Sequence, residues 1–170
     1  MQPTEIKQKR AKTPEEALSA LMRLCARAEK AEGDARRLMR GWGLADSEAE
    51  KVLARLVRDR FIDDSRYADA FVREKLRLSG WGAYKIRTAL QRKGIPKETI
   101  DTALAQADRA GMAERLLTQL VRKSRTVKYA TPYELKTKLI RYGLSLGYDY
   151  EAVTEAAASL QKQTDPCDEF

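Results

Sequence analysis

The sequence predicts an all-α protein made of three tandem three-helix repeats that form an elongated, curved module. Apolar residues recur at the 3.6-residue spacing of helices, and no segment alternates as a strand does. A threonine followed by proline, a typical helix start, occurs at Thr13-Pro14 and again at Thr131-Pro132. Pairs of a glycine and an apolar residue recur with a period near 50 residues, which indicates a helical repeat array.

The first repeat is expected over residues 13–62. Its first helix starts at Thr13, and Glu16 completes a capping box. A short helix over residues 35–40 ends at the glycines of Gly41-Trp42-Gly43, and a third helix starts at Ser47 with the spacing of a second capping box. The expected core positions of the first and third helices are Leu18, Leu21, Met22, Cys25, Ala28, Ala49, Val52, Leu53, Leu56 and Val57.

The second repeat is expected over residues 63–109 and the third over residues 110–161. The pair Asp63-Asp64 opens the second repeat, and Thr131 and Asp149 start later helices. Residues 1–12 are expected to be a disordered basic arm and residues 162–170 a frayed acidic tail. The expected core positions of these two repeats are Tyr67, Ala70, Phe71, Leu78, Ile86, Ala89, Leu90, Ile100, Ala103, Leu104, Ala107, Leu116, Leu117, Leu120, Val121, Leu135, Leu139, Tyr142, Val153, Ala157 and Leu160.

The three repeats are aligned on one glycine each. The register that matches Gly43-Leu44, Gly94-Ile95 and Gly143-Leu144 spaces them 51 and 49 residues apart. This register makes three sets of residues equivalent, namely Ala35, Ile86 and Leu135; Met39, Leu90 and Leu139; and the outward cations Arg36, Arg87 and Lys136.

The composition argues against an enzyme and against a metal or cofactor. Histidine is absent, which removes the commonest metal ligand and the usual general base near neutral pH. Cys25 and Cys167 lie far apart, and no phosphate-binding glycine loop is present. A helix cap at Asp63-Asp64 is favoured over a two-metal carboxylate site, because no other acidic residues cluster nearby at usable spacing.

The chain is expected to be a cytoplasmic monomer without contact to membranes. No apolar run is long enough to span a bilayer, and the polar, basic start lacks the apolar core of a secretory signal. Two distant cysteines agree with a reducing compartment.

Positive charge is concentrated in two blocks. The chain has 33 Lys and Arg against 25 Asp and Glu, a formal net charge of +8. Residues 71–94 hold seven cations and one acid, and residues 115–141 hold eight cations and one acid. Cations that only solubilise a helix are usually interleaved with acids, so these blocks favour a negatively charged partner. Trp81, Tyr84 and Tyr129 lie beside the cations and could stack on a partner, although core packing is favoured for Trp81.

Two segments of the second repeat resemble the RecX family of bacterial regulatory proteins. Residues 61–73, FIDDSRYADAFVR, are similar to the opening of the family's second repeat, and residues 80–95, GWGAYKIRTALQRKGI, are similar to its signature. Residues 147–153, GYDYEAV, resemble the family's ending. The first repeat departs from the pattern at Gly33-Asp34 and at Gly41-Trp42-Gly43.

The resemblance implies three tandem three-helix repeats and a role as a modulator of DNA repair. Proteins of this family bind the RecA recombinase, mostly as its filament on single-stranded DNA. They inhibit filament extension, ATP hydrolysis, strand exchange and the SOS co-protease activity. The partners implied here are the RecA filament and, by direct contact, single-stranded DNA.

The contact residues are inferred from charge, because the resemblance does not fix them. Their expected role is charge complementarity toward DNA phosphates or acidic recombinase residues. The expected contact residues are Arg73, Lys75, Arg77, Lys85, Arg87, Arg92, Lys93, Lys123, Arg125, Lys128, Lys136, Lys138 and Arg141.

Two alternatives to a recombinase regulator remain open at this point. One is a stand-alone DNA-binding protein without sequence specificity, since no base-reading motif is present. The other is a helical-repeat scaffold for an acidic protein. Salt-sensitive binding to plain DNA without an effect on a filament favours the first, and absence of DNA binding favours the second.

Overall fold

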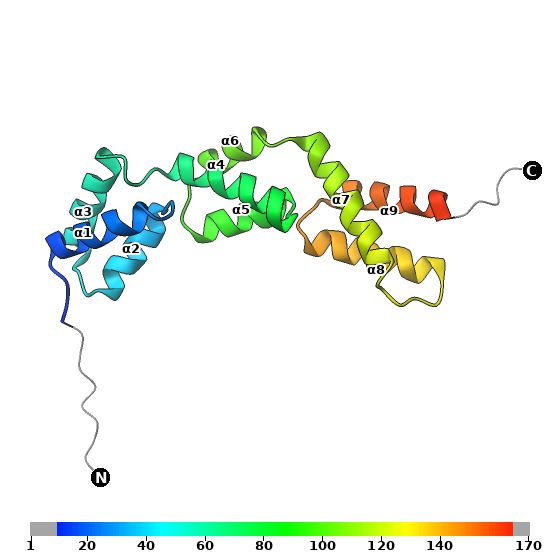
Figure 1. Cartoon of the computed structure of the whole chain (residues 1–170), viewed down its shortest axis with the longest axis horizontal. Helices are drawn as coiled ribbons and strands as arrows, with labels where there is room; N and C mark the ends of the chain where they lie inside the picture. Colours follow the sequence, from blue (N-terminus) through cyan, green and yellow to red (C-terminus); the bar gives the residue numbers. More distant parts are fainter. Residues whose placement is uncertain (1–9, 165–170) are drawn as a thin grey trace, which may run out of the picture. The chain divides into compact units, whose positions relative to one another are not determined.

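The computed structural model describes residues 10–164, apart from the side chains of residues 109–110 and 161–164. Residues 1–9 of the expected arm, residues 165–170 of the expected tail and Cys167 lie outside the described residues. Within the described range the secondary structure is entirely helical, which confirms the all-α prediction (Figure 1). The elements in chain order are α1 (Pro14–Cys25), α2 (Glu32–Gly41), α3 (Asp46–Arg58), α4 (Asp64–Glu74), the π-helix η1 (Lys75–Ser79), α5 (Ala83–Arg92), α6 (Lys97–Ala105), α7 (Arg109–Ser124), α8 (Pro132–Ser145) and α9 (Tyr150–Thr164).

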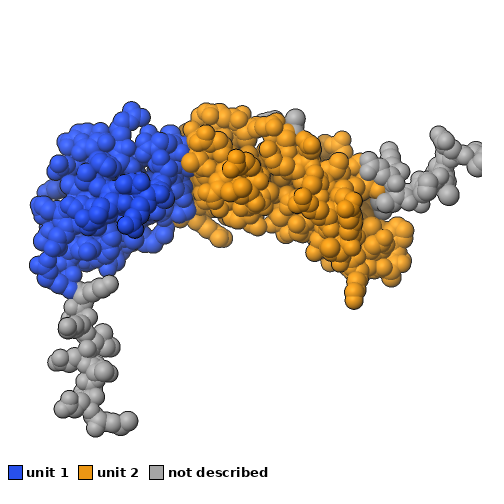
Figure 2. Space-filling view, in the orientation of Figure 1, with its two compact units in different colours: residues 1–67, 93–95 blue, residues 68–92, 96–170 orange. Residues whose placement is uncertain are grey.

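The chain divides into two compact units (Figure 2). Unit 1 comprises residues 1–67 and 93–95, and unit 2 comprises residues 68–92 and 96–170. In unit 1, α1 and α2 both pack against α3 around a core that includes the fully buried Leu21, Met39 and Leu56. In unit 2, α5 packs on α6, and α7, α8 and α9 pack on one another around Leu116, Leu120 and Val153.

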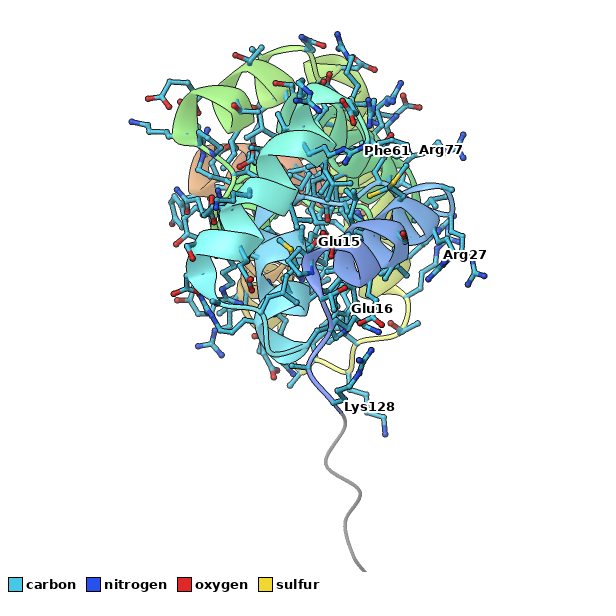
Figure 3. The ribbon with its side chains drawn as sticks, turned by 90° about the vertical axis from the view of Figure 1, so that its left-hand side faces the viewer. Glu15, Glu16, Arg27, Phe61, Arg77 and Lys128 are labelled. Carbon is cyan, nitrogen blue, oxygen red and sulfur yellow. The ribbon has the colours of Figure 1, made fainter. Side chains whose placement is uncertain are left out.

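Local capping explains where several helices begin. Thr13 and Glu16 form the predicted capping box of α1, whose first-turn acids Glu15 and Glu16 are labelled in Figure 3. The backbone N–H of Glu134 donates to the Thr131 hydroxyl, and that of Ala152 donates to the Asp149 carboxylate, so these two predicted caps are confirmed. The capping box predicted at Ser47 is wrong, because α3 already begins at Asp46 and its N-cap residue Ala45 provides no side-chain bond.

The pair Asp63-Asp64 acts in capping, as predicted. The Asp63 carboxylate accepts the backbone N–H of Arg66 at 3.0 Å, and this bond lowers the pKa of Asp63. The Asp64 carboxylate accepts the backbone N–H of Glu32 at 2.9 Å, at the N-terminus of α2 in unit 1. Burial raises the pKa of Asp64, although the bond from Glu32 works in the opposite direction.

A π-helical turn changes the face that the end of α4 presents. The π-helical turn η1 is wider than an α-helical turn and shifts the side chains at its end. Leu76 stays buried on the face of Val72, whereas Leu78 is 70% exposed. The prediction that Leu78 lies in the core is therefore wrong, since it assumed a constant period of 3.6 residues. Val57 is also exposed, at 39%, where a core position was expected.

The repeat register of the third repeat also differs from the prediction. Gly43, Gly94 and Gly147 have φ values of 82°, 81° and 90°, and each follows the second helix of its repeat by two residues. Gly143 lies inside α8 against Val153 and is not their equivalent. The residues that match Ile86 and Leu90 are therefore Leu139 and Gly143, four positions beyond those predicted.

An ion pair repeated in two repeats supports the corrected register. Arg36 of α2 bonds to Glu50 of α3 at 2.7 Å, and Arg87 of α5 bonds to Asp101 of α6. Arg87 follows Arg36, and Asp101 follows Glu50, by the same number of residues as Gly94 follows Gly43. The corresponding residues of the third repeat are Ile140 and Thr154, so Lys136 is not the equivalent of Arg36 and Arg87. The buried Thr154 hydroxyl has no hydrogen-bond partner among the described residues.

Within unit 2, main-chain atoms join the loop before α5 to the loop after α8. The N–H of Gly82 donates to the carbonyl of Leu146 at 2.8 Å, and the N–H of Tyr84 donates to the carbonyl of Gly147 at 3.0 Å. A Cβ on Gly82 would overlap the Gly147 carbonyl, and a Cβ on Gly147 would overlap Lys85. Only glycine therefore allows the two loops to approach so closely.

Candidate interaction surface

Four of the predicted contact cations are held in ion pairs. Lys75 pairs with Glu74 at 2.8 Å, Lys138 pairs with Glu134 at 2.6 Å, and Arg87 pairs with Asp101. Lys93 pairs with Asp34 at 2.8 Å. Asp34 and Asp101 lie outside the two basic blocks in the sequence, so counting charges along the chain did not reveal them. These four cations are partly neutralised within the protein.

The Lys93 pair is the least exposed of these contacts. In unit 1 its ammonium lies between both carboxylate oxygens of Asp34, at 3.0 and 2.8 Å, and the ring of Tyr67, whose centroid is 5.5 Å away. Burial disfavours the charged form, but the bonds to Asp34 and Tyr67 outweigh it and raise the pKa of Lys93. Lys93 stays charged and serves the packing of unit 1.

Trp81 is enclosed by two further predicted contact residues in unit 2. The ammonium groups of Lys75 and Lys85 lie 5.4 and 4.7 Å from its ring centroid, and its ring meets Phe71 nearly edge-on at 6.4 Å. Cations over a tryptophan face gain about 0.5–2 kcal/mol. Trp81 therefore packs within the protein, as favoured from the sequence. In α7, Lys123 lies over Tyr142 in the same way, at 5.2 Å.

The remaining predicted cations are available to a partner. Among the described residues none of them forms an ion pair, and all lie in unit 2, on α4 and η1, on α5, on α8 and in the loop between α7 and α8. They are Arg73, Arg77, Arg92, Arg125, Lys128, Lys136 and Arg141.

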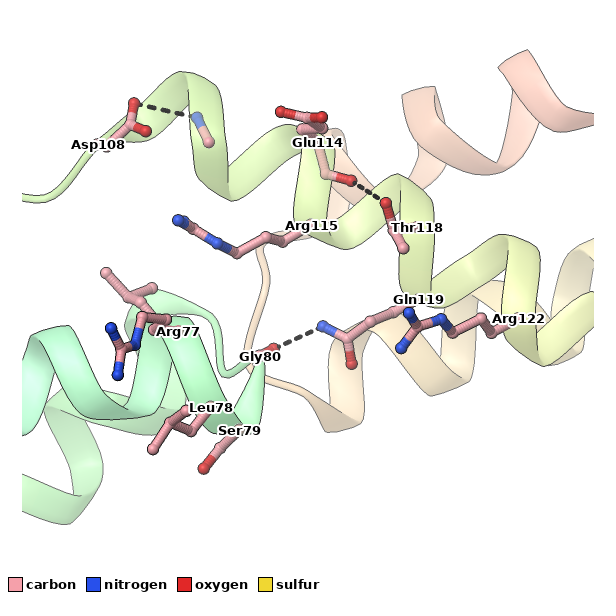
Figure 4. Close-up of a pocket in the computed structure, with 12 residues that line it drawn as sticks. Arg77, Leu78, Ser79, Gly80, Asp108, Glu114, Arg115, Thr118, Gln119 and Arg122 are labelled. Atoms are coloured by element: carbon pink, nitrogen blue, oxygen red, sulfur yellow. Dashed lines mark hydrogen bonds between the residues drawn. The ribbon is translucent and has the colours of Figure 1, made fainter.

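An open cleft of about 500 Å³ lies between η1 and α7 in unit 2. In Figure 4 the Arg115 side chain extends into the gap between the two elements, with Arg77 on the opposite wall and Arg122 further along α7. The residues that line this cleft, called here the Arg77 cleft, are Leu76, Arg77, Leu78, Ser79, Gly80, Asp108, Gly111, Glu114, Arg115, Thr118, Gln119 and Arg122.

Hydrogen bonds fix the walls of the Arg77 cleft. The Gln119 amide of α7 donates to the carbonyl of Gly80 at 2.9 Å, which ties α7 to the end of η1. Asp108 caps α7 by accepting the N–H of Gly111 at 3.0 Å. Arg115 and Arg122 were absent from the residues predicted by sequence. Their spacing of seven residues, which places both on one face of a helix, was the available signal.

A smaller hollow of about 290 Å³ lies between α5 and the turn after α8, also in unit 2. Tyr84, which is 73% exposed, lines it together with Arg92, Trp81 and Lys85. The predicted placement of Tyr84 beside cations is confirmed. An exposed aromatic ring beside a free guanidinium can stack on a nucleic acid base.

The second repeat matches a known family, and relatives extend the match over most of the chain. The family model described as the second three-helix domain of RecX matches residues 63–104. The regulatory protein RecX of Prosthecochloris aestuarii is 30% identical over 118 residues, which cover 69% of this chain and 76% of that protein. The chain belongs to the RecX family. The regulatory protein RecX of Clostridium botulinum strain Alaska E43 is 33% identical over 113 residues, 65% of this chain and 52% of the relative.

A solved RecX structure shows the same fold. The crystal structure of RecX from Lactobacillus salivarius superposes with a TM-score of 0.78 at 17% identity, covering 88% of this chain and 97% of that one. The chain spans about half the length of several curated RecX relatives that it matches. In the part that the structure describes, no helix is long and apolar enough to cross a membrane.

Proposed function

We propose that this protein is a cytoplasmic, non-catalytic regulator that binds the RecA recombinase and its filament on single-stranded DNA and inhibits recombinase activity. The activities it would reduce are filament extension, ATP hydrolysis, strand exchange and co-protease action. The observation that carries the proposal is the match of residues 63–104 to the second RecX domain. This range contains the whole first basic block, residues 71–94, including Arg73, Arg77 and Arg92, which are unpaired among the described residues. RecX membership supports a regulatory role rather than catalysis.

The free cations of unit 2 give the proposal a physical basis. A recombinase filament on DNA presents phosphates and acidic side chains, and unpaired guanidinium and ammonium groups speed encounter with such a surface. A filament also repeats the same subunit, so several weak contacts on one bound molecule add up through a high effective concentration. Inhibition then requires that the bound protein prefer a filament state that cannot extend.

The test measures RecA ATP turnover on poly(dT) as the purified protein is titrated in. Wild type is expected to reduce turnover, and Arg92→Glu/Lys136→Glu is expected to need about tenfold more protein for the same inhibition, because two attractive contacts become repulsive. The matched control, Arg27→Glu/Lys51→Glu, changes the net charge equally in unit 1 and should inhibit as wild type does. Arg27 points outward just beyond α1 (Figure 3). Wild type without any effect on turnover would contradict the proposal.

The hollow at Tyr84 supports a second candidate, a stand-alone DNA-binding protein without sequence specificity. Stacking of a base on Tyr84 beside Arg92 needs no recombinase. This candidate predicts a salt-sensitive gel shift on single-stranded DNA, lost in Tyr84→Ala, together with unchanged ATP turnover of a preformed filament. Inhibition of turnover by wild type decides in favour of the regulator.

A further inference from the structure

The Arg77 cleft holds three guanidinium groups that the fold does not use. Among the described residues, Arg77, Arg115 and Arg122 form no ion pair, whereas Arg87 and Arg36 are both paired. All three line one hollow of about 500 Å³ (Figure 4). Guanidinium groups bind carboxylate or phosphate through two parallel N–H bonds, so a concave site with three of them is suited to an anionic ligand.

An exposed apolar side chain lies beside these arginines. Leu78 is 70% exposed and lines the Arg77 cleft because η1 turns it out of the core. A second hollow of about 530 Å³ shares Arg77, Arg115 and Leu78 and adds Val72 and Ala107. An aliphatic wall contributes little to binding a phosphate backbone, but it can bury an apolar side chain of a peptide at about 25 cal/mol per Å².

Acidic residues on the same walls argue against a continuous polyanion. Asp108 lines both hollows, Glu114 lines the first and Glu74 lines the second. A DNA strand carries a negative charge at every nucleotide and would pass these carboxylates. A peptide can place its one or two carboxylates against the arginines and neutral or basic residues against the acids.

We infer that the Arg77 cleft is the docking site for an acidic and partly apolar peptide segment of the protein partner. Arg77, Arg115 and Arg122 bind its carboxylates, and Leu78 contacts a neighbouring apolar side chain. The identity of the partner as the recombinase rests on the proposed function.

The experiment compares binding of the full chain to DNA-free RecA, by biolayer interferometry, with binding to fluorescein-labelled (dT)36, by anisotropy. Arg77→Gln/Arg115→Gln/Arg122→Gln is expected to lose about tenfold or more in affinity for RecA and at most about threefold for (dT)36. The matched control, Arg92→Gln/Lys136→Gln/Arg141→Gln, removes equal charge outside the cleft and should show the reverse order.

Leu78→Ser provides a variant without a change of charge. It is expected to weaken binding to RecA about threefold or more and to leave (dT)36 binding unchanged, since an exposed leucine does not contribute to DNA affinity. Because Leu78 is exposed, this variant should fold as wild type, which circular dichroism verifies.

The outcomes separate the inference from the proposed function. If wild type binds RecA but the cleft variants bind it equally well, or if the triple variant loses DNA affinity more than RecA affinity, the cleft is not a peptide site. If wild type binds neither DNA-free RecA nor its filament, the proposed function fails and the inference that rests on it fails with it.

Discussion

The guanidinium of Arg87 on α5 is bonded to the carboxylate of Asp101 on α6, which makes Arg87 a structural residue of the second repeat. From the sequence it was expected to contact a partner. Its counterpart in unit 1, Arg36, bonds to Glu50, and this contact raises the pKa of Arg36 and lowers that of Glu50. Both side chains of the Arg87 pair are partly exposed, at 34% and 45%, so solvent screening limits its contribution to stability.

Reversal of Arg87 should therefore affect stability. We expect Arg87→Glu to lower the free energy of unfolding by about 1 kcal/mol, because an attractive pair becomes repulsive. The swap Arg87→Glu/Asp101→Arg should recover at least half of the loss. Urea denaturation followed by circular dichroism measures both. Equal stability of the single variant and wild type would show that the pair has no energetic role.

Gly147 should tolerate alanine far less than Gly94. Both have positive φ, which costs a non-glycine residue about 1 kcal/mol, but a Cβ on Gly147 would also overlap Lys85, whereas a Cβ on Gly94 meets nothing within 4 Å. We expect losses of about 3 kcal/mol for Gly147→Ala and about 1 kcal/mol for Gly94→Ala. Trp81 and Trp42 lie in units 2 and 1, so fluorescence in single-tryptophan backgrounds reports each unit separately. Similar losses would contradict the close approach of the loops.

The π-helical turn predicts opposite outcomes for two nearby leucines. Leu76 is 6% exposed, so Leu76→Ala should cost about 2–4 kcal/mol through loss of buried methyl groups and the cavity left behind. Leu78→Ala should change the free energy of unfolding by less than about 0.5 kcal/mol, because Leu78 is 70% exposed. Thermal denaturation of the two variants tests this directly. Equal losses of stability in the two variants would contradict the placement of Leu76 in the core and of Leu78 on the surface.

The raised pKa of Lys93 predicts a stability difference that disappears at alkaline pH. A cation with a folded-state pKa above its ordinary value of 10.5 stabilises the fold below that pH and loses this contribution as pH rises through the folded-state pKa. Lys93→Met should therefore be less stable than wild type by about 1–2 kcal/mol at neutral pH.

Urea denaturation at several pH values distinguishes this effect from the general titration of lysines. The difference in the free energy of unfolding between wild type and Lys93→Met should stay constant up to about pH 9 and become smaller above about pH 10.5. The exposed Lys51, changed to Met, is the matched control for the loss of one lysine from unit 1. If the difference in stability between wild type and Lys93→Met does not change with pH, the ion pair with Asp34 makes no contribution to the free energy of unfolding.

Local chemistry determined how much of the fold was predictable. Thr13, Thr131 and Asp149 cap their helices through neighbours three residues away, so the sequence alone reveals them. The predicted register of the third repeat was wrong because Gly143 and Gly147 both follow apolar residues in the sequence. The positive backbone φ of Gly147 distinguishes the two in the structure. The prediction of Leu78 as a core residue was wrong because the π-helical turn cannot be recognised from the amino-acid composition of the segment.

The candidate surface was less predictable than the fold. Pairs such as Lys93 with Asp34 join residues that are distant in sequence, so a count of nearby charges overestimated the free cations. Arg115 and Arg122 are candidate contact residues because they line a cleft together with η1, which belongs to another repeat in the sequence. The concentration of cations in two blocks, in the second and third repeats, could be predicted, whereas the use of each cation could not.

The contact of Gly82 and Gly147 through main-chain atoms has a consequence for the divergence of these proteins. Peptide groups are common to all residue types, so almost every side chain around this contact can be exchanged while the distance between the two loops is preserved. The crystal structure from Lactobacillus salivarius retains the fold at 17% identity. Such a junction requires glycine at two positions, here Gly82 and Gly147, more than it requires any particular apolar or charged residue.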